Sequence, residues 1–381
     1  MSNVNMTSVR PVSTDPSSKS DRIIAIDALR GFDMFWIIGG RELALALVSA
    51  TSTSVPAWLD YQLEHVEWEG FTAWDLIMPL FLFVVGASMP FSFSKRLSKG
   101  VSKPQLYLKM LSRAAILFIL GMMVQGHLLD FDSSTLHIYC NTLQSIAVGY
   151  LVSGIVMLNV GVAGQLLFTA LMLVGFWLIM IFVPFDSHSA GVLQPNANVA
   201  LAVDEYVLGR FRDGTTYTWL LSGMTFTATV LLGVQSGHVL RSSLPPVRRF
   251  VLLTSIGCLC LAGGWLWAAW LDFPIIKHIW TSSMVLWAAG WSFLLLALFY
   301  LLIDIAGAWR WAFPFVVIGM NAITLYVASF FVPFGDIAKG LVGGLARHLD
   351  RGGPVLIEFT AVLLIWLVAY HMYRHRIFVR V

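Results

Sequence analysis

Long apolar runs separated by short polar segments dominate the hydropathy pattern of this 381-residue chain. An α-helix needs about 20 mainly apolar residues to cross the hydrocarbon core of a lipid bilayer. By that measure the sequence predicts about ten membrane-spanning helices. The predicted spans are residues 25–48, 71–94, 110–128, 140–159, 163–184, 217–238, 250–270, 283–303, 312–332 and 355–373. The predicted fold class is an all-α polytopic membrane bundle, in which each helix satisfies its own backbone polar groups.

The composition agrees with this fold class and excludes others. Hydrophobic residues make up 58% of the chain and charged residues only 12%, whereas about a quarter of a typical soluble domain is charged. The formal net charge of +3 is too small to indicate a nucleic-acid partner. Cys140, Cys258 and Cys260 are scattered and match neither a disulfide framework nor a metal-ligand spacing, so no metal is expected.

The distribution of Lys and Arg predicts that both termini are cytoplasmic, because positive charges concentrate on the inner side of a membrane. With that orientation the outer segments contain only Arg210, Arg212, Lys277, Lys339, Arg347 and Arg351. Residues 1–20, rich in Ser, Thr, Asn and Pro, are expected to be a disordered cytoplasmic tail, with no signal peptide before the first span. Residues 21–381 are expected to form a single transmembrane domain.

The three longest connecting segments, 49–70, 185–216 and 333–354, fall on the predicted outer side and mix aromatic, acidic, His and Gly residues. This predicts a ligand site on that side. Short interfacial helices are expected near 56–64 and 336–350. Three glycines within 340–344 leave open a loop that dips into the membrane instead, because glycine disfavours a helix interior.

His65 and Asp75 are the strongest candidates for chemistry. Histidine titrates near neutral pH, and a carboxylate at the start of a membrane span is costly unless it has a function. On one continuous helix these residues would lie about 15 Å apart. Gly70 lies between them and allows the chain to reverse, so that Asp75 could orient one ring nitrogen and leave the other free as a base.

Two other interpretations of this segment stay open at this point. His65 could be a surface histidine among Glu64, Glu67 and Glu69, unrelated to Asp75. A metal site formed by Glu64, His65 and Glu67 is the weaker alternative, because a single imidazole with two carboxylates at this spacing matches no familiar zinc pattern.

Other polar residues are predicted at membrane depth, where they usually face a bundle interior or a wet cavity. Asp27 and Arg30 have the i, i+3 spacing of an ion pair within one helix, and Arg113 lies in the third span. Asn141 and Gln144 share one face of the fourth span, where they could line a cavity or form hydrogen bonds between helices.

Several sequence blocks, in order along nearly the whole chain, resemble the heparan-α-glucosaminide N-acetyltransferase family of transmembrane acyltransferases. The blocks are residues 22–32 (RIIAIDALRGF), 65–88 (HVEWEGFTAWDLIMPLFLFVVGAS), 232–237 (LGVQSG), 277–282 (KHIWTS), 319–323 (GMNAI) and 373–378 (YRHRIF). The resemblance implies an enzyme that takes acetyl groups from cytosolic acetyl-CoA and delivers them to the amino group of a terminal glucosamine across the membrane. It also implies that His65 is the catalytic histidine and Asp75 its partner, and that a homodimer forms.

Two departures from the family pattern qualify this expectation. The luminal amino-terminal extension of lysosomal members is missing here, which favours a bacterial-type inner-membrane protein. The asparagine that follows the first span in the family has no counterpart, since residues 37–41 read IIGGR.

The remaining site predictions divide between the two substrates. Arg30, Arg113, Gln144 and Asn321 are expected to line the passage for the coenzyme A thioester. Trp68, Glu69, Asn141 and Lys277 are expected to contact the amino-sugar acceptor.

More than one mechanism and more than one class of protein fit the sequence. His65 could act as a general base, which we favour, or as a transient acyl carrier. The rival functions are a membrane transporter of amino sugars or glycan fragments and a non-catalytic glycan-binding component.

Overall fold

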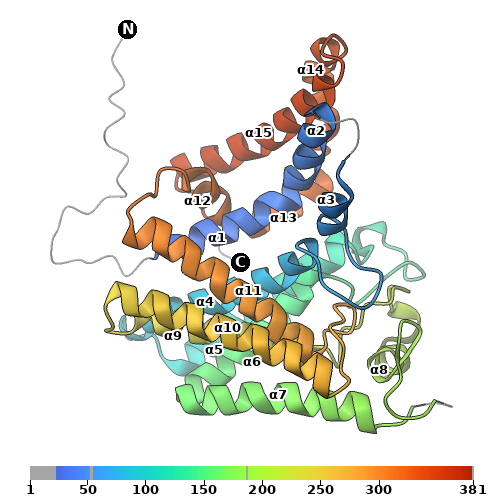
Figure 1. Cartoon of the computed structure of the whole chain (residues 1–381), viewed down its shortest axis with the longest axis vertical. Coiled ribbons are helices and arrows are strands. Elements are labelled where there is room, and N and C mark those ends of the chain that lie inside the picture. The colour runs from blue at the N-terminus through green and yellow to red at the C-terminus, as the bar shows by residue number, and fades with distance from the viewer. Residues whose placement is uncertain (1–22, 52–54, 186–187, 380–381) are drawn as a thin grey trace.

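The structure is a computed structural model that describes residues 23–51, 55–185 and 188–379, and the described chain is mostly helical (Figure 1). The long helices are α1 (Ile24–Phe35), α2 (Arg41–Thr51), α4 (Ile77–Leu97), α5 (Lys103–Val124), α6 (Thr142–Asn159), α7 (Val162–Phe182), α9 (Gly223–Arg241), α10 (Pro246–Trp270), α11 (Ser282–Tyr300) and α15 (Gly352–Arg374). The remaining α-helices are α3 (Ala57–Gln62), α8 (Val199–Leu208), α12 (Phe313–Gly319), α13 (Ala322–Phe331) and α14 (Phe334–Ala346). Strands β1 (Leu193–Gln194) and β2 (Ala197–Asn198) form a minimal hairpin.

Within the described ranges, eight helices are long and apolar enough to cross a membrane, or up to nine if the bent pair α12–α13 is one span. The multi-pass helical bundle is therefore confirmed, whereas the predicted count of about ten is not. Helix α9, which corresponds to the predicted span 217–238, is not among the eight. Its Thr, Ser and Gln side chains are buried at the centre of the bundle, where they bond to helix carbonyls and to other buried side chains.

The central helices α4 and α9 pack backbone to backbone. A Cβ atom added at Gly86 would lie 2.0 Å from the Val230 carbonyl oxygen, and one added at Gly233 would lie 2.0 Å from the Phe83 carbonyl oxygen. Small residues allow this close approach, which is a common mode of helix association in membranes. The α4–α9 pair forms the rigid centre on which the surrounding helices pack.

Two predicted continuous spans are broken, which corrects the sequence-based boundaries. The span 25–48 consists of α1 and α2 joined by the π-helical turn Trp36–Gly40, in which Gly39 has a φ of 133°. The span 312–332 consists of α12 and α13, bent by 76°. At this bend the Asn321 amide donates to the Ile377 carbonyl oxygen and accepts from the Val379 N–H, so it holds the carboxyl-terminal segment.

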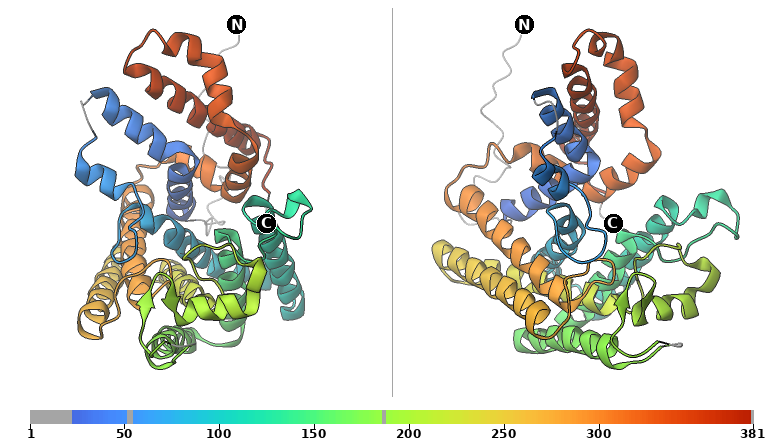
Figure 2. Two further views of the ribbon diagram at one scale, coloured as in Figure 1. Left: turned by 90° about the vertical axis from the view of Figure 1, so that its right-hand side faces the viewer. Right: turned by 45° about the vertical axis from the view of Figure 1, so that its right-hand side comes forward.

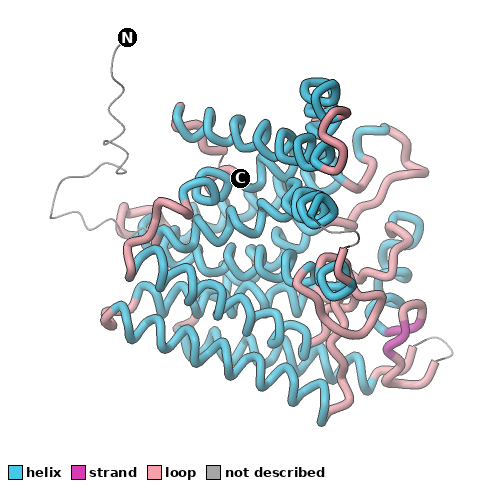
Figure 3. Tube along the Cα trace, turned by 45° about the horizontal axis from the view of Figure 1, so that its top comes forward, coloured by secondary structure: helices cyan, strands magenta, loops and turns pink. Residues whose placement is uncertain are grey.

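Most of the long connections gather at one end of the bundle, on the right-hand side of Figure 3. We call this the loop-rich end and define it by residues 63–76, 125–141, 188–222 and 271–281. Helices α3 and α14 confirm the two expected short helices, so the alternative of a membrane-dipping loop at 340–344 is wrong. Figure 2 shows α14 and α15 beside α1 and α2 at one edge of the bundle. Helix α8 and the β1–β2 hairpin within 185–216 had not been predicted.

Candidate active site

Gly70 reverses the chain ahead of α4, as the sequence predicted. Its φ of +123° is a conformation that favours glycine, since a side chain there is strained. The Gly70 N–H donates to the Ile275 carbonyl oxygen at 2.9 Å, and Glu69 pairs with Ile276 in an isolated β-bridge. The turn that carries His65 is therefore fixed to the loop between α10 and α11.

This reversal brings His65 onto Asp75, with 2.7 Å between His65 Nδ1 and Asp75 Oδ1. Asp75 is fully buried, and its second oxygen, Oδ2, accepts the backbone N–H of Thr72 at 3.1 Å and that of Val66 at 3.4 Å. The Thr72 hydroxyl lies 3.0 Å from the same oxygen and 2.6 Å from the Glu64 carbonyl oxygen. Because a carboxylate only accepts hydrogen bonds, we assign the proton to Nδ1, which leaves Nε2 as an acceptor.

Lys277 completes this cluster from a distant part of the sequence. Its Nζ atom lies 3.3 Å from Asp75 Oδ1 and 3.1 Å from His65 Nδ1, and the residue is only 3% exposed. Burial lowers the pKa of Lys277 to about 8, although the neighbouring Asp75 carboxylate acts in the opposite direction. His65, Asp75 and Lys277 thus form one hydrogen-bonded group, which we call the catalytic cluster.

His278 follows Lys277 in the sequence and stays neutral at physiological pH. Burial lowers the pKa of His278 to about 4, with the charges of Lys277 and His65 acting in the same direction. Its Nδ1 lies 2.6 Å from the Thr216 hydroxyl oxygen, and its ring stacks on Tyr217 with 4.2 Å between centroids.

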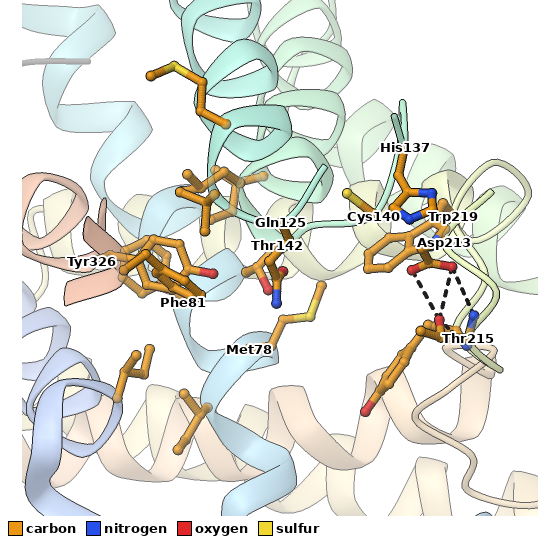
Figure 4. A pocket seen from close by; sticks show the side chains of 18 of the residues that line it. Met78, Phe81, Gln125, His137, Cys140, Thr142, Asp213, Thr215, Trp219 and Tyr326 are labelled. Atoms are coloured by element: carbon orange, nitrogen blue, oxygen red, sulfur yellow. Dashed lines mark hydrogen bonds between the residues drawn. The ribbon is translucent and has the colours of Figure 1, made fainter. Parts of the chain in front are cut away.

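A cavity of about 940 Å³ opens beside the catalytic cluster, near the upper end of the size range of ligand pockets. His65, Lys277 and Trp74 form one part of its wall, and polar residues of segments 125–142 and 213–219 form another (Figure 4). The rest is mainly apolar and comes from α1, α4, α5, α6 and α13. The apolar wall includes Met34, Ile37, Ile77, Met78, Phe81, Val124, Leu143, Ile146, Phe330 and Phe331.

None of the four residues predicted for the thioester passage is in the cavity wall. Arg30 donates to the Ser88 hydroxyl at 2.8 Å and pairs with Asp27. The Arg113 guanidinium lies 4.6 Å from the centre of the Tyr150 ring. The Gln144 side chain caps the start of α6, and Asn321 binds the carboxyl-terminal segment as described above.

The residues predicted for the acceptor are also divided. Lys277 lines the cavity, whereas the Trp68 indole donates to the Leu193 carbonyl oxygen at 2.8 Å and the Glu69 side chain is exposed. Asn141 is buried behind the wall, where its amide donates to Gln125 and Tyr326, two residues that do line the cavity.

Sequence reasoning missed Thr72 and the aromatic and acidic residues of segment 213–219. For Thr72 a signal was present. Thr72 and Asp75 have the Thr-x-x-Asp spacing that often precedes an apolar helix, because the two side chains can bond to each other's backbone. The role of Asp75 in this turn agrees with that pattern, since it accepts from Thr72 N–H.

The fold and this site define a multi-pass membrane protein with an exposed histidine hydrogen-bonded to a buried carboxylate beside a large cavity. No family model matches the chain. It is 23% identical to heparan-alpha-glucosaminide N-acetyltransferase of Homo sapiens, across 97% of this chain and 61% of that protein. It is 22% identical to the protein of the same name from Mus musculus, across 95% of this chain and 61% of that protein. The chain thus spans about 61% of the length of these relatives, and the similarity supports a distant relationship.

Proposed function

We propose that this chain is a transmembrane acetyltransferase. It transfers an acetyl group from cytosolic acetyl-CoA to the amino group of an amino sugar, either glucosamine or the terminal glucosamine of a glycan. The observation that carries the proposal is the His65–Asp75 hydrogen bond at the wall of a cavity of about 940 Å³ inside a membrane bundle. The similarity to the two N-acetyltransferases supports it.

The reaction is proposed to take place on the extracytoplasmic side of a bacterial-type inner membrane. The concentration of Lys and Arg in the turns opposite the loop-rich end supports this orientation, because such residues favour the cytoplasmic side. Both termini would then be cytoplasmic, and the catalytic cluster would face outward.

The apolar wall of the cavity suits the uncharged part of an acetyl-CoA donor. Coenzyme A carries phosphate charges, and even one charge at the membrane centre costs about 3 kcal/mol or more, so the nucleotide stays on the cytoplasmic side. The apolar wall of the cavity matches the uncharged pantetheine arm. Arg30 lies one helical turn beyond Met34, and Arg113 lies over Tyr150, one turn beyond Ile146. Both cations are thus positioned between the cavity and the cytoplasmic turns.

The chain's own residues can perform direct transfer. His65 Nε2 takes a proton from the acceptor ammonium, and the free amine attacks the thioester carbonyl. The new C–N bond forms, the C–S bond breaks, and the nitrogen loses a second proton as the amide forms. One of the two protons ends on the leaving thiolate and the other passes through the imidazole to water. Asp75 keeps the His65 ring in its orientation and stabilises the imidazolium while it carries the proton. The alternative route would pass through an acetyl group bound covalently to His65.

The test is coenzyme A release by detergent-purified protein supplied with acetyl-CoA and glucosamine. We expect His65→Ala to abolish release while acetyl-CoA binding is retained, because Nε2 acts on the amine and not on the nucleotide. His348→Gln is the matched control, since His348 is exposed on the segment after α14 and is not in the cavity wall. Near-normal turnover by His65→Ala would refute the proposed role. Acetylated His65 accumulating without acceptor would select the covalent route.

A membrane transporter of amino sugars is the second candidate, because the broken helix pair α12–α13 borders the cavity. Discontinuous helices beside a midplane cavity are typical of transporters. Uptake of unmodified glucosamine into vesicles without thiol release would select this function over acetyl transfer.

A further inference from the structure

The segment from Asp213 to Trp219 presents alternate residues to the cavity. Asp213, Thr215, Tyr217 and Trp219 all line it. Of the residues between them, Thr216 and Thr218 contact the other side, where the Thr216 hydroxyl meets His278 Nδ1 and the Thr218 N–H donates to the His278 carbonyl oxygen at 3.0 Å. The chain bends at residues 214–216, where Gly214 has a φ of 73°, so this alternation belongs to a bent segment with one face on the cavity.

Buried contacts fix this segment relative to the catalytic cluster. Asp204, which is fully buried, accepts the N–H groups of Trp219 at 2.7 Å and of Leu220 at 2.9 Å. At the same time, Tyr217 stacks on His278, the neighbour of Lys277 in the sequence. The exposed face of the segment is therefore held at a set position relative to His65.

A second polar wall of the cavity comes from segment 125–142. His127, Asp130 and His137 line the same cavity, and His127 Nδ1 lies 2.9 Å from Asp130 Oδ2. The Ile138 N–H donates to the Phe211 carbonyl oxygen at 3.0 Å, which ties this wall to the start of the segment that carries Asp213. Figure 4 shows His137, Asp213 and Trp219 side by side at one end of the cavity.

Hydrogen-bonding capacity remains unused at this end. Trp219 is only 5% exposed, yet its indole N–H has no hydrogen-bond partner among the described residues, and the same holds for His137 Nδ1. Buried polar groups are normally paired, but both nitrogen atoms are inaccessible to solvent and so lie behind the cavity surface. The polar residues that line this end include the carboxylates Asp130 and Asp213 as acceptors and the exposed His127 imidazole as a donor.

We propose that the space bounded by His127, Asp130, His137, Asp213, Thr215 and Trp219 binds the ring hydroxyls of the acceptor while its amine faces His65. This inference rests on the proposed function and deepens it, because it defines the acceptor as a polyhydroxylated ring and not merely an amine. A carboxylate accepts hydrogen bonds from two neighbouring hydroxyl groups, and an imidazole N–H such as that of His127 donates to a hydroxyl oxygen. This subsite replaces the acceptor contacts expected at Trp68 and Glu69, whose side chains do not line the cavity.

The experiment measures glucosamine binding by calorimetry in the absence of donor, on the full-length detergent-purified protein. Asp213→Asn keeps the shape of the side chain but removes its charge. Asp132→Asn is the matched control, because Asp132 accepts from Ser134 N–H and hydroxyl as Asp213 does from Thr215, yet it does not line the cavity.

We expect Asp213→Asn to weaken glucosamine binding at least about tenfold, since a hydrogen bond to a charged group is lost or weakened. Asp132→Asn should bind like the wild type. Cyclohexylamine, which has the ring and the amine but no hydroxyl groups, should bind equally weakly to the wild type and to Asp213→Asn. These results together would support a subsite that reads hydroxyl groups.

Results that would overturn this inference differ from results that would overturn the proposed acetyl transfer. Equal glucosamine affinity of Asp213→Asn and Asp132→Asn, or no glucosamine binding to the wild type, would overturn this inference. Glucosamine binding that depends on Asp213, but without any coenzyme A release by the wild type, would instead support the subsite and overturn the proposed acetyl transfer.

Discussion

Replacing Lys277 with methionine should alter how the stability of the protein depends on pH. Lys277 is 3% exposed, and burial lowers its pKa from 10.5 to about 8 even though Asp75 Oδ1 lies 3.3 Å from its Nζ atom. Between these two pH values the unfolded chain binds a proton that the folded chain does not. The free energy of unfolding of the wild type therefore rises with pH across this window, because the cost of burying the ammonium disappears.

The size of the rise follows from the pKa difference. One pKa unit corresponds to about 1.36 kcal/mol, so the change from 10.5 to about 8 corresponds to about 3 kcal/mol in total. The cost of the buried charge is fully present below pH 8 and is removed by pH 10.5. Lys277→Met has no group to titrate there, so its unfolding free energy should lack this rise.

The assay is equilibrium unfolding in detergent from pH 7 to pH 10.5, followed by tryptophan fluorescence. Lys339→Met is the control, because Lys339 is exposed on α14 and far from any buried carboxylate in the catalytic cluster. The control should keep the wild-type rise, so that general effects of pH cancel in the comparison. An identical rise in Lys277→Met, Lys339→Met and the wild type would refute the reasoning.

Three further substitutions test the local structure of the site. Thr72→Val removes a hydroxyl 3.0 Å from Asp75 Oδ2 and should lower kcat about tenfold at unchanged donor affinity, and wild-type kcat would contradict this. Gly70→Ala places a side chain at a φ of +123° and should lower stability by about 1–3 kcal/mol in denaturant unfolding; an unchanged midpoint would argue against the strain. Asp204→Ala removes the acceptor of the Trp219 and Leu220 N–H groups, and each lost hydrogen bond should cost about 1.5–3 kcal/mol of unfolding free energy, whereas wild-type stability would count against the anchoring role.

The helices were predictable because the bilayer demands long apolar runs, and these runs are local properties of the sequence. The two breaks were not, since they depend on distant contacts. Gly39 and Gly40 form a local pair that favours a kink, but the chain has 31 glycines and the pair alone does not fix the bend. Asn321 precedes α13, and its side chain bonds to the backbone of Ile377 and Val379, more than fifty residues away in the sequence. Helix α9 differs again, because central burial allows it to be less apolar than helices that face lipid.

The candidate site also combines contacts between residues close in the sequence with contacts between distant residues. His65 and Asp75 are ten residues apart, and the glycine between them made their contact one of the interpretations open from the sequence. The structure places His65 Nδ1 2.7 Å from Asp75 Oδ1. Lys277 is 212 residues from His65, and its position depends on the bridge between Glu69 and Ile276. Lys277, which is predicted to contact the acceptor, lines the cavity and in addition lies 3.3 Å from Asp75 Oδ1, a contact that the sequence pattern does not indicate.

The acceptor contacts predicted at Trp68 and Glu69 stay predictions, although neither residue lines the cavity. The reversal at Gly70 that brings His65 to Asp75 leaves Trp68 against Leu193 and Glu69 exposed. The alternation of Asp213, Thr215, Tyr217 and Trp219 was visible in the sequence, but alternation alone predicts only an extended chain with two different faces. The buried Asp204 carboxylate accepts the Trp219 and Leu220 N–H groups, so the face that meets the cavity, where we propose that the acceptor binds, depends on packing within the 188–222 segment.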